Sequence, residues 1–170
     1  MTQNLSRLLL AAAAAAVLSP AGAEAPAVTY QLVQPTDFTD FDLGRHSADE
    51  TARVFDDKFR QYVLPLAEEL FPGGQHLALE IRDIDMAGEI QPWRNVDRQP
   101  VRYVEFAYPP KMEIRYQLKD AAGGVLAEGE KTLTDPSFDA RPVTSHRQEP
   151  FRIEIRMLES WLKELAGSAS

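Results

Sequence analysis

The sequence contains no cysteine among its 170 residues. This absence excludes disulfides, thiolate metal ligands, a cysteine nucleophile and a lipid-anchoring cysteine. The sequence also lacks a glycine-rich phosphate loop, an H-E-x-x-H zinc motif and the G-x-S-x-G elbow of serine hydrolases. Its three histidines are too far apart to resemble a set of metal ligands. We therefore expect no cofactor and no metal site, and these absences favour a protein that is not an enzyme.

Positive charge is scarce, because 18 Lys and Arg residues stand against 26 Asp and Glu residues and give a net charge of −8. Nucleic acids and anionic membranes attract basic surfaces, so neither is an expected partner. No apolar run reaches the roughly 20 residues that a membrane-spanning helix needs. We therefore expect no transmembrane segment.

The first 23 residues have the order of a secretory signal peptide. Arg7 precedes an apolar run over residues 8–18, and Ser19-Pro20 then breaks the helix. The triplet Ala21-Gly22-Ala23 has the small-x-small pattern that signal peptidase cleaves. We expect cleavage after Ala23 and a periplasmic or secreted product. The alternatives are cleavage after Ala25, or a buried N-terminal helix.

The rest of the chain predicts a single α+β domain over residues 26–167, with an N-terminal strand and loop over 24–46 and a short tail over 168–170. A strand is expected at 28–33. Ser47 and Glu50 form a capping box, which predicts a helix start. The helix carries an apolar stripe as far as Leu70, and Pro65 should interrupt its hydrogen-bond ladder and kink it near Gln61.

The second half of the chain predicts more strands and a final helix. Alternating or β-rich segments occur at 77–82, 101–107, 112–118 and 125–135, with a glycine-containing turn at 120–124. Residues 151–167 fit a strand or a helix, and the longer helical pattern favours a helix that Gly167 ends. The expected order is β-α-β-β-β-β-α. We predict a two-layer fold, in which an antiparallel meander sheet has two amphipathic helices on one face.

Two carboxylates are candidate site residues. If the strand register that starts at Leu77 continued, Asp83 and Asp85 would face the core, where two neighbouring charges are costly. A bulge near Arg82 could instead send Ile84 and Met86 inward. The two aspartates could also form an acid or metal site. A third possibility is pairing with backbone amides or with an arginine, namely Arg82, Arg102 or Arg115.

Two other features have both structural and functional interpretations. Trp93 lies in a loop that contains proline and arginine, where it could form an exposed binding edge or cover one end of the core. Asp37, Asp40 and Asp42 resemble a calcium loop in composition alone, because the glycine and glutamate of that motif are missing. We interpret these three aspartates as turn-forming residues.

Several short motifs occur in order along the chain. They are Pro35-x-x-Phe38-x-Asp40, Asp83-Ile84-Asp85-Met86-Ala87-Gly88-Glu89, Tyr108-Pro109-Pro110-x-Met112, Leu118-x-Asp120-x-x-Gly123, Leu133-Thr134-Asp135 and Met157-Leu158-x-x-Trp161-Leu162. With this order the chain resembles the bacterial exported proteins of the DUF3016 family. The resemblance implies a small exported protein of Gram-negative bacteria, and it supplies no activity and no functional residue.

Three functions agree with these observations. The first is a non-catalytic module that binds a protein or another component of the cell envelope. The second is a carrier of a small ligand, which would need an apolar cavity. The third is an enzyme or metal binder that uses Asp83 and Asp85. The sequence favours the first function and leaves the oligomeric state open.

Overall fold

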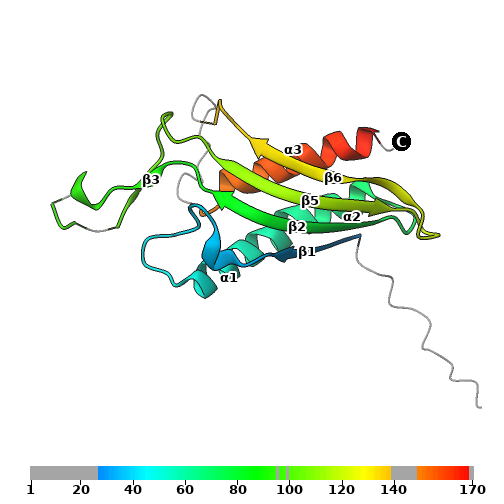
Figure 1. The fold of residues 1–170 in the computed structure, drawn as a ribbon, viewed down its shortest axis with the longest axis horizontal. Coiled ribbons are helices and arrows are strands. Elements are labelled where there is room, and N and C mark those ends of the chain that lie inside the picture. The colour runs from blue at the N-terminus through cyan, green and yellow to red at the C-terminus, as the bar shows by residue number, and fades with distance from the viewer. Residues whose placement is uncertain (1–26, 95, 99, 139–148, 169–170) are drawn as a thin grey trace, which may run out of the picture.

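A mixed sheet of four strands forms one layer of the molecule (Figure 1). The computed structural model describes residues 27–94, 96–98, 100–138 and 149–168, so the predicted signal peptide lies outside the described residues. The sheet has the strand order β1-β2-β5-β6. Its strands are β1 (Val28–Leu32), β2 (His76–Asp85), β5 (Lys111–Lys119) and β6 (Val125–Thr134).

The prediction of an antiparallel meander is wrong for the first strand, because β1 runs parallel to β2. The pairs β2–β5 and β5–β6 are antiparallel. Strands that a tight turn joins must be antiparallel, whereas a helical crossover lets two strands run parallel. The helix between β1 and β2 provides that crossover, so the fold is α+β with a mixed sheet.

The segment 101–107 is not a strand of this sheet. Only β4 (Arg102–Tyr103) is extended and paired there, and it pairs with β3 (Glu89–Ile90) in a separate two-stranded ribbon. A short 3-10 turn, η3 (Pro92–Arg94), follows β3. Another 3-10 turn, η1 (Pro35–Asp37), follows β1.

The first helical segment consists of α1 (Ala48–Lys58), the π turn η2 (Phe59–Val63) and α2 (Leu64–Leu70). The capping box is confirmed: the Ser47 N–H donates to Glu50 Oε2 over 2.8 Å, and the Glu50 N–H donates to Ser47 Oγ over 3.3 Å. Pro65 has no N–H to continue the α-helical ladder. The chain forms a π turn over Phe59–Val63 just before it, so the expected interruption of the α-helical ladder is found around Gln61.

The last element, α3 (Arg152–Ser168), is a helix, as expected. The helix continues one residue past Gly167, so this glycine does not end it. Ser168, which was predicted to belong to the C-terminal tail, is the last residue of the helix. No helix in the described part of the chain is long and apolar enough to cross a membrane.

Both helical segments cover the same face of the sheet and enclose the core (Figure 1). At alternate positions of β2, the side chains of Leu77, Leu79 and Ile81 are buried in the core. Aromatic side chains belong to the same buried cluster. The Tyr30 ring stacks on Phe59 with centroids 3.7 Å apart. The other face of the sheet carries mainly polar and charged side chains, such as Glu80, Arg115, Gln117, Glu128 and Glu130.

Candidate functional site

A β-bulge determines where the two predicted site carboxylates point. The register between β2 and β5 shifts between Ile81 and Asp83. Ile84 and Met86 are consequently the buried residues beyond the bulge, and the aspartates are half-buried. The bulge interpretation of this segment is confirmed, since an uninterrupted period of two would have placed both carboxylates in the core.

Asp83 is held by the loop that precedes α1. The backbone N–H of Thr39 donates to Asp83 Oδ1 over 2.7 Å, and the Thr39 hydroxyl donates to Oδ2 over 2.8 Å. A backbone amide, one of the partners considered for the aspartates, is therefore found here together with a hydroxyl. Asp83 ties the loop to β2.

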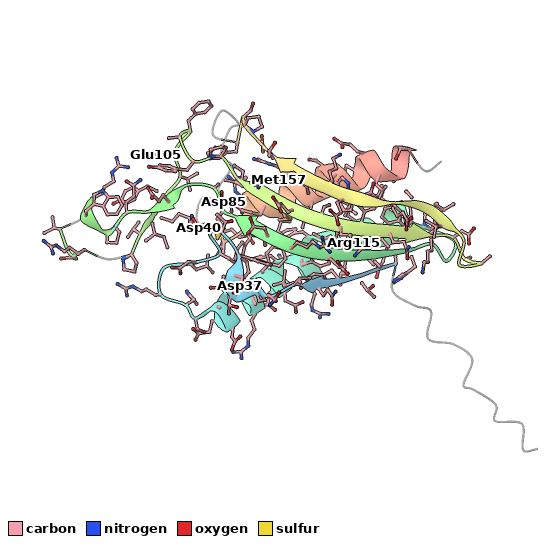
Figure 2. The ribbon with its side chains drawn as sticks, in the orientation of Figure 1. Asp37, Asp40, Asp85, Glu105, Arg115 and Met157 are labelled. Carbon is pink, nitrogen blue, oxygen red and sulfur yellow. The ribbon has the colours of Figure 1, made fainter. Side chains whose placement is uncertain are left out.

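Asp85 has different surroundings, although it is only two residues away. Its carboxylate makes no hydrogen bond to a described residue, and burial raises its pKa, with smaller contributions from the charges of Asp40 and Asp83. Asp40 lies beside it in a parallel bridge (Figure 2). The Asp40 N–H donates to Ile84 O, and the Met86 N–H donates to Asp40 O, both over 3.0 Å.

Arg102 on β4 neutralises Asp40 by a bidentate contact. Its two terminal nitrogens donate to Asp40 Oδ2 and Oδ1 over 2.8 and 2.6 Å. The same nitrogens donate to the carbonyl oxygens of Gly88 and Asp42 over 3.0 and 2.8 Å. One guanidinium thus joins β4, the turn after β2 and the loop before α1, and this planar fork geometry is specific to arginine.

Gly88 allows the chain to turn out of the sheet. Its φ is +79°, and a Cβ at this position would lie 2.2 Å from the carbonyl oxygen of Tyr103. Only glycine combines this backbone conformation with so close an approach. The turn and β4 are therefore packed backbone against backbone.

A buried glutamate supports the same region from the helix layer. Glu154, in the first turn of α3, is 2 % exposed, and the backbone N–H of Ala87 donates to its Oε1 over 2.9 Å. Burial raises the pKa of Glu154, and the Ala87 N–H and the nearby Arg102 charge partly oppose this rise. The helix N-terminus also favours a carboxylate at this position.

Asp40, Asp83, Arg102, Gly88 and Glu154 together form a structural joint at the end of the sheet. Asp40, Asp83 and Glu154 are each held by a backbone amide or an arginine, whereas Asp85 accepts no hydrogen bond from the described part of the chain. Within the described ranges, no group of three or more His, Asp or Glu side chains is placed to hold a metal ion. The joint fixes the base of the segment that follows it.

The described residues of that segment, 89–94, 96–98 and 100–108, project beyond the end of the sheet (Figure 1) and are called the arm below. It carries large apolar side chains in contact with solvent: Trp93 is 69 % exposed, Phe106 68 % and Val96 fully exposed. Arg94 and Glu105 form an ion pair inside the arm, and the Arg94 guanidinium lies 4.6 Å from the centroid of the Tyr103 ring. The arm therefore combines internally paired charges with unburied aromatic surface.

The exposure of Trp93 rules out the interpretation that it covers one end of the core. The apolar residues that accompany it, including Val96 and Phe106, were not identified from the sequence. A usable signal was present, because both faces of the strand expected at residues 101–107 are half apolar. Such a segment is buried on both sides or exposed in an arm, and the sequence pattern alone does not distinguish the two.

The fold and these surfaces define a small two-layer α+β domain with an apolar arm at one end of its sheet. The chain belongs to the family described as a protein of unknown function, DUF3016, which it matches over residues 26–164. The resemblance expected from the sequence motifs is thus confirmed. No curated protein and no solved structure matches the chain.

Proposed function

We propose that this chain is an exported, non-catalytic binding module that engages an envelope protein through its arm. The observation that carries the proposal is the distribution of apolar surface. Of the nine large hydrophobic residues that are exposed among the described ones, six lie on the arm. An exposed apolar patch of this kind is typical of a contact surface for another protein. These residues are Trp93, Val96, Val101, Val104, Phe106 and Tyr108.

The joint at the base of the arm supports a binding role. Arg102, Gly88 and Glu154 fix the direction of the arm before any partner is present. A preorganised contact surface loses less conformational entropy on binding than a flexible one. Trp93 has the aromatic side chain most often found as an anchor in protein interfaces.

A small-ligand carrier and an enzyme or metal binder that uses Asp83 and Asp85 remain the alternative proposals. A thermal-shift screen with divalent metals and small metabolites tests both. Stabilisation of the wild type that Asp85→Asn abolishes, in a variant that keeps its fold, would favour these alternatives over the binding module.

The arm can be tested by photo-crosslinking in cells. A photoreactive amino acid at position 96 on the arm is expected to give one saturable adduct in the envelope fraction. The matched control is the same amino acid at position 126, an exposed leucine in β6 that lies outside the arm. Trp93→Ser should abolish the adduct, whereas Leu126→Ser should not.

Two outcomes would contradict this proposal. One is equal labelling from positions 96 and 126, which would show no preference for the arm. The other is an adduct at position 96 that persists in the Trp93→Ser variant. Sequencing the N-terminus of the same purified protein tests export, because cleavage after Ala23 leaves Glu24 as the first residue.

A further inference from the structure

We propose that a groove between β1 and the first helical segment binds an extended segment of a partner protein, with apolar side chains at alternate positions and one carboxylate. The groove has a volume of about 540 Å³. It is a different surface from the arm, so this proposal does not depend on the arm binding a partner. The groove is lined by Val28, Thr29, Tyr30, Gln31 and Leu32 of β1 and by Ala52, Arg53, Asp56, Arg60 and Leu64 of the helical segment.

The outer edge of β1 offers backbone groups for another strand. The Leu77 N–H donates to Ala27 O and the Val33 N–H donates to Ile81 O, each over 2.9 Å. Backbone direction alternates along a strand, so the N–H and C=O groups of Val28, Tyr30 and Leu32 point away from β2. No other described strand pairs with this edge. An extended segment can form the missing ladder, as in peptide recognition by strand addition.

The floor of the groove selects apolar side chains. Leu32, Ala52 and Leu64 are half-buried there and present apolar atoms. The Tyr30 ring is fixed, because it stacks on Phe59 and its hydroxyl donates to Asp56. A segment added to β1 would point every second side chain toward this floor. Alternating apolar residues are therefore the pattern that fits.

The rim of the groove selects a carboxylate. Arg60 is already engaged, because its Nε donates to Asp56 Oδ2 over 2.7 Å. Arg53 is exposed and makes no hydrogen bond or ion pair to a described residue. Its charge lowers the pKa of nearby Glu50, but its guanidinium donors are open to solvent beside the apolar groove. Such a local positive group is complementary to an acidic side chain or a C-terminal carboxylate.

The test uses a phage-displayed library of random heptapeptides, selected on the immobilised full chain. We expect the enriched peptides to alternate apolar residues and to carry Asp, Glu or a free C-terminus. Arg53→Glu should weaken their binding by about tenfold or more, as expected when a charge-assisted hydrogen bond is lost. The matched control is Arg45→Glu, another exposed arginine, which lies outside the groove.

Hydrogen exchange then locates the bound peptide. The amides of Tyr30 and Leu32 should exchange about tenfold more slowly in the complex, because they gain hydrogen-bond partners. The amides of Thr29 and Gln31, which face β2, should not change. The proposal is overturned if no peptide is enriched, if Arg53→Glu and Arg45→Glu bind equally, or if the protected amides lie elsewhere. Concentration-dependent dimerisation that protects Tyr30 and Leu32 without peptide would assign the groove to a second copy instead.

Discussion

The two neighbouring aspartates on β2 differ in what holds them. Asp83 accepts two hydrogen bonds from Thr39, whereas Asp85 accepts none from a described residue and lies beside Asp40. The residue type and spacing are the same, so this difference comes entirely from the loop that packs against the strand.

This difference predicts opposite effects on stability. Asp83→Ala should lower the free energy of unfolding by about 1–3 kcal/mol, because the Thr39 amide and hydroxyl lose their acceptor. Asp85→Asn should leave stability unchanged or raise it at pH 7, because it removes a charge that burial and two neighbouring carboxylates disfavour. Urea denaturation of both variants measures the two effects. Equal losses in the two variants would contradict the assignment.

The burial of Glu154 predicts that the stability of the protein depends on pH through this one residue. Its raised pKa means that the folded state prefers the protonated form. Its contribution to stability is therefore fully present below the unfolded-state pKa of about 4.3, and it is lost as the pH rises through the folded-state pKa. Glu154→Gln keeps an acceptor for the Ala87 N–H and removes this loss. We expect the variant to equal the wild type in stability near pH 4 and to be more stable than the wild type at pH 7.

Urea denaturation between pH 4 and pH 8 checks this dependence. Glu164→Gln is the matched control on the same helix, since Glu164 is exposed and pairs with Lys131. A lower stability of Glu154→Gln at pH 7 would mean that its carboxylate is needed in the charged form, as a partner for Arg102.

At the residue scale, sequence reasoning identified the aspartates of β2 but not the joint that they belong to. Asp40 was interpreted as a turn former, and Arg102 was considered only as one possible partner of Asp83 and Asp85. The contact between Arg102 and Asp40 joins residues 62 positions apart. No local pattern predicts such a pairing, because it depends on how the loop folds over the end of the sheet.

Local signals account for most of the helical elements. The capping box at Ser47 and the effect of Pro65 involve residues within one turn of each other, so both were predictable. The apolar residues after Phe151 recur at helical spacing over a long segment, which predicted a helix, and this prediction is confirmed. The segment 101–107 was misassigned, because exposed and buried apolar residues give the same pattern.

The π turn gives a prediction at the element scale. Phe59 is fully buried at its start, whereas Tyr62 in the same turn is 36 % exposed. Phe59→Ala should lower the free energy of unfolding by about 3–5 kcal/mol, through lost burial and the cavity left behind. Tyr62→Ala should cost much less than Phe59→Ala, because it removes chiefly the hydrogen bond from the exposed Tyr62 hydroxyl to Glu149. Chemical denaturation separates the two variants, and similar losses would show that the helix buries a different face.

At the scale of the whole molecule, the sequence predicted the α+β class and the placement of both helical segments on one face. It did not predict the mixed sheet. The pairing of β1 with β2 is carried by backbone hydrogen bonds between segments that a whole helical segment separates. Side chains alternate along β1 in the same way whether its neighbour is parallel or antiparallel. The hydrophobic pattern of the sequence therefore does not indicate the direction of pairing.

The parallel pairing of β1 has a consequence for a chain that is made from its N-terminus. β1 is the first strand to be synthesised, but its strand partners are residues 77–81 of β2. β1 therefore stays unpaired until β2 has been synthesised. The β5–β6 hairpin can close locally around Asp120 and Gly124. The part of the apolar face that α3 covers stays exposed until α3, the last described element, has been synthesised. Completion of the core is therefore a late event that depends on the C-terminal helix.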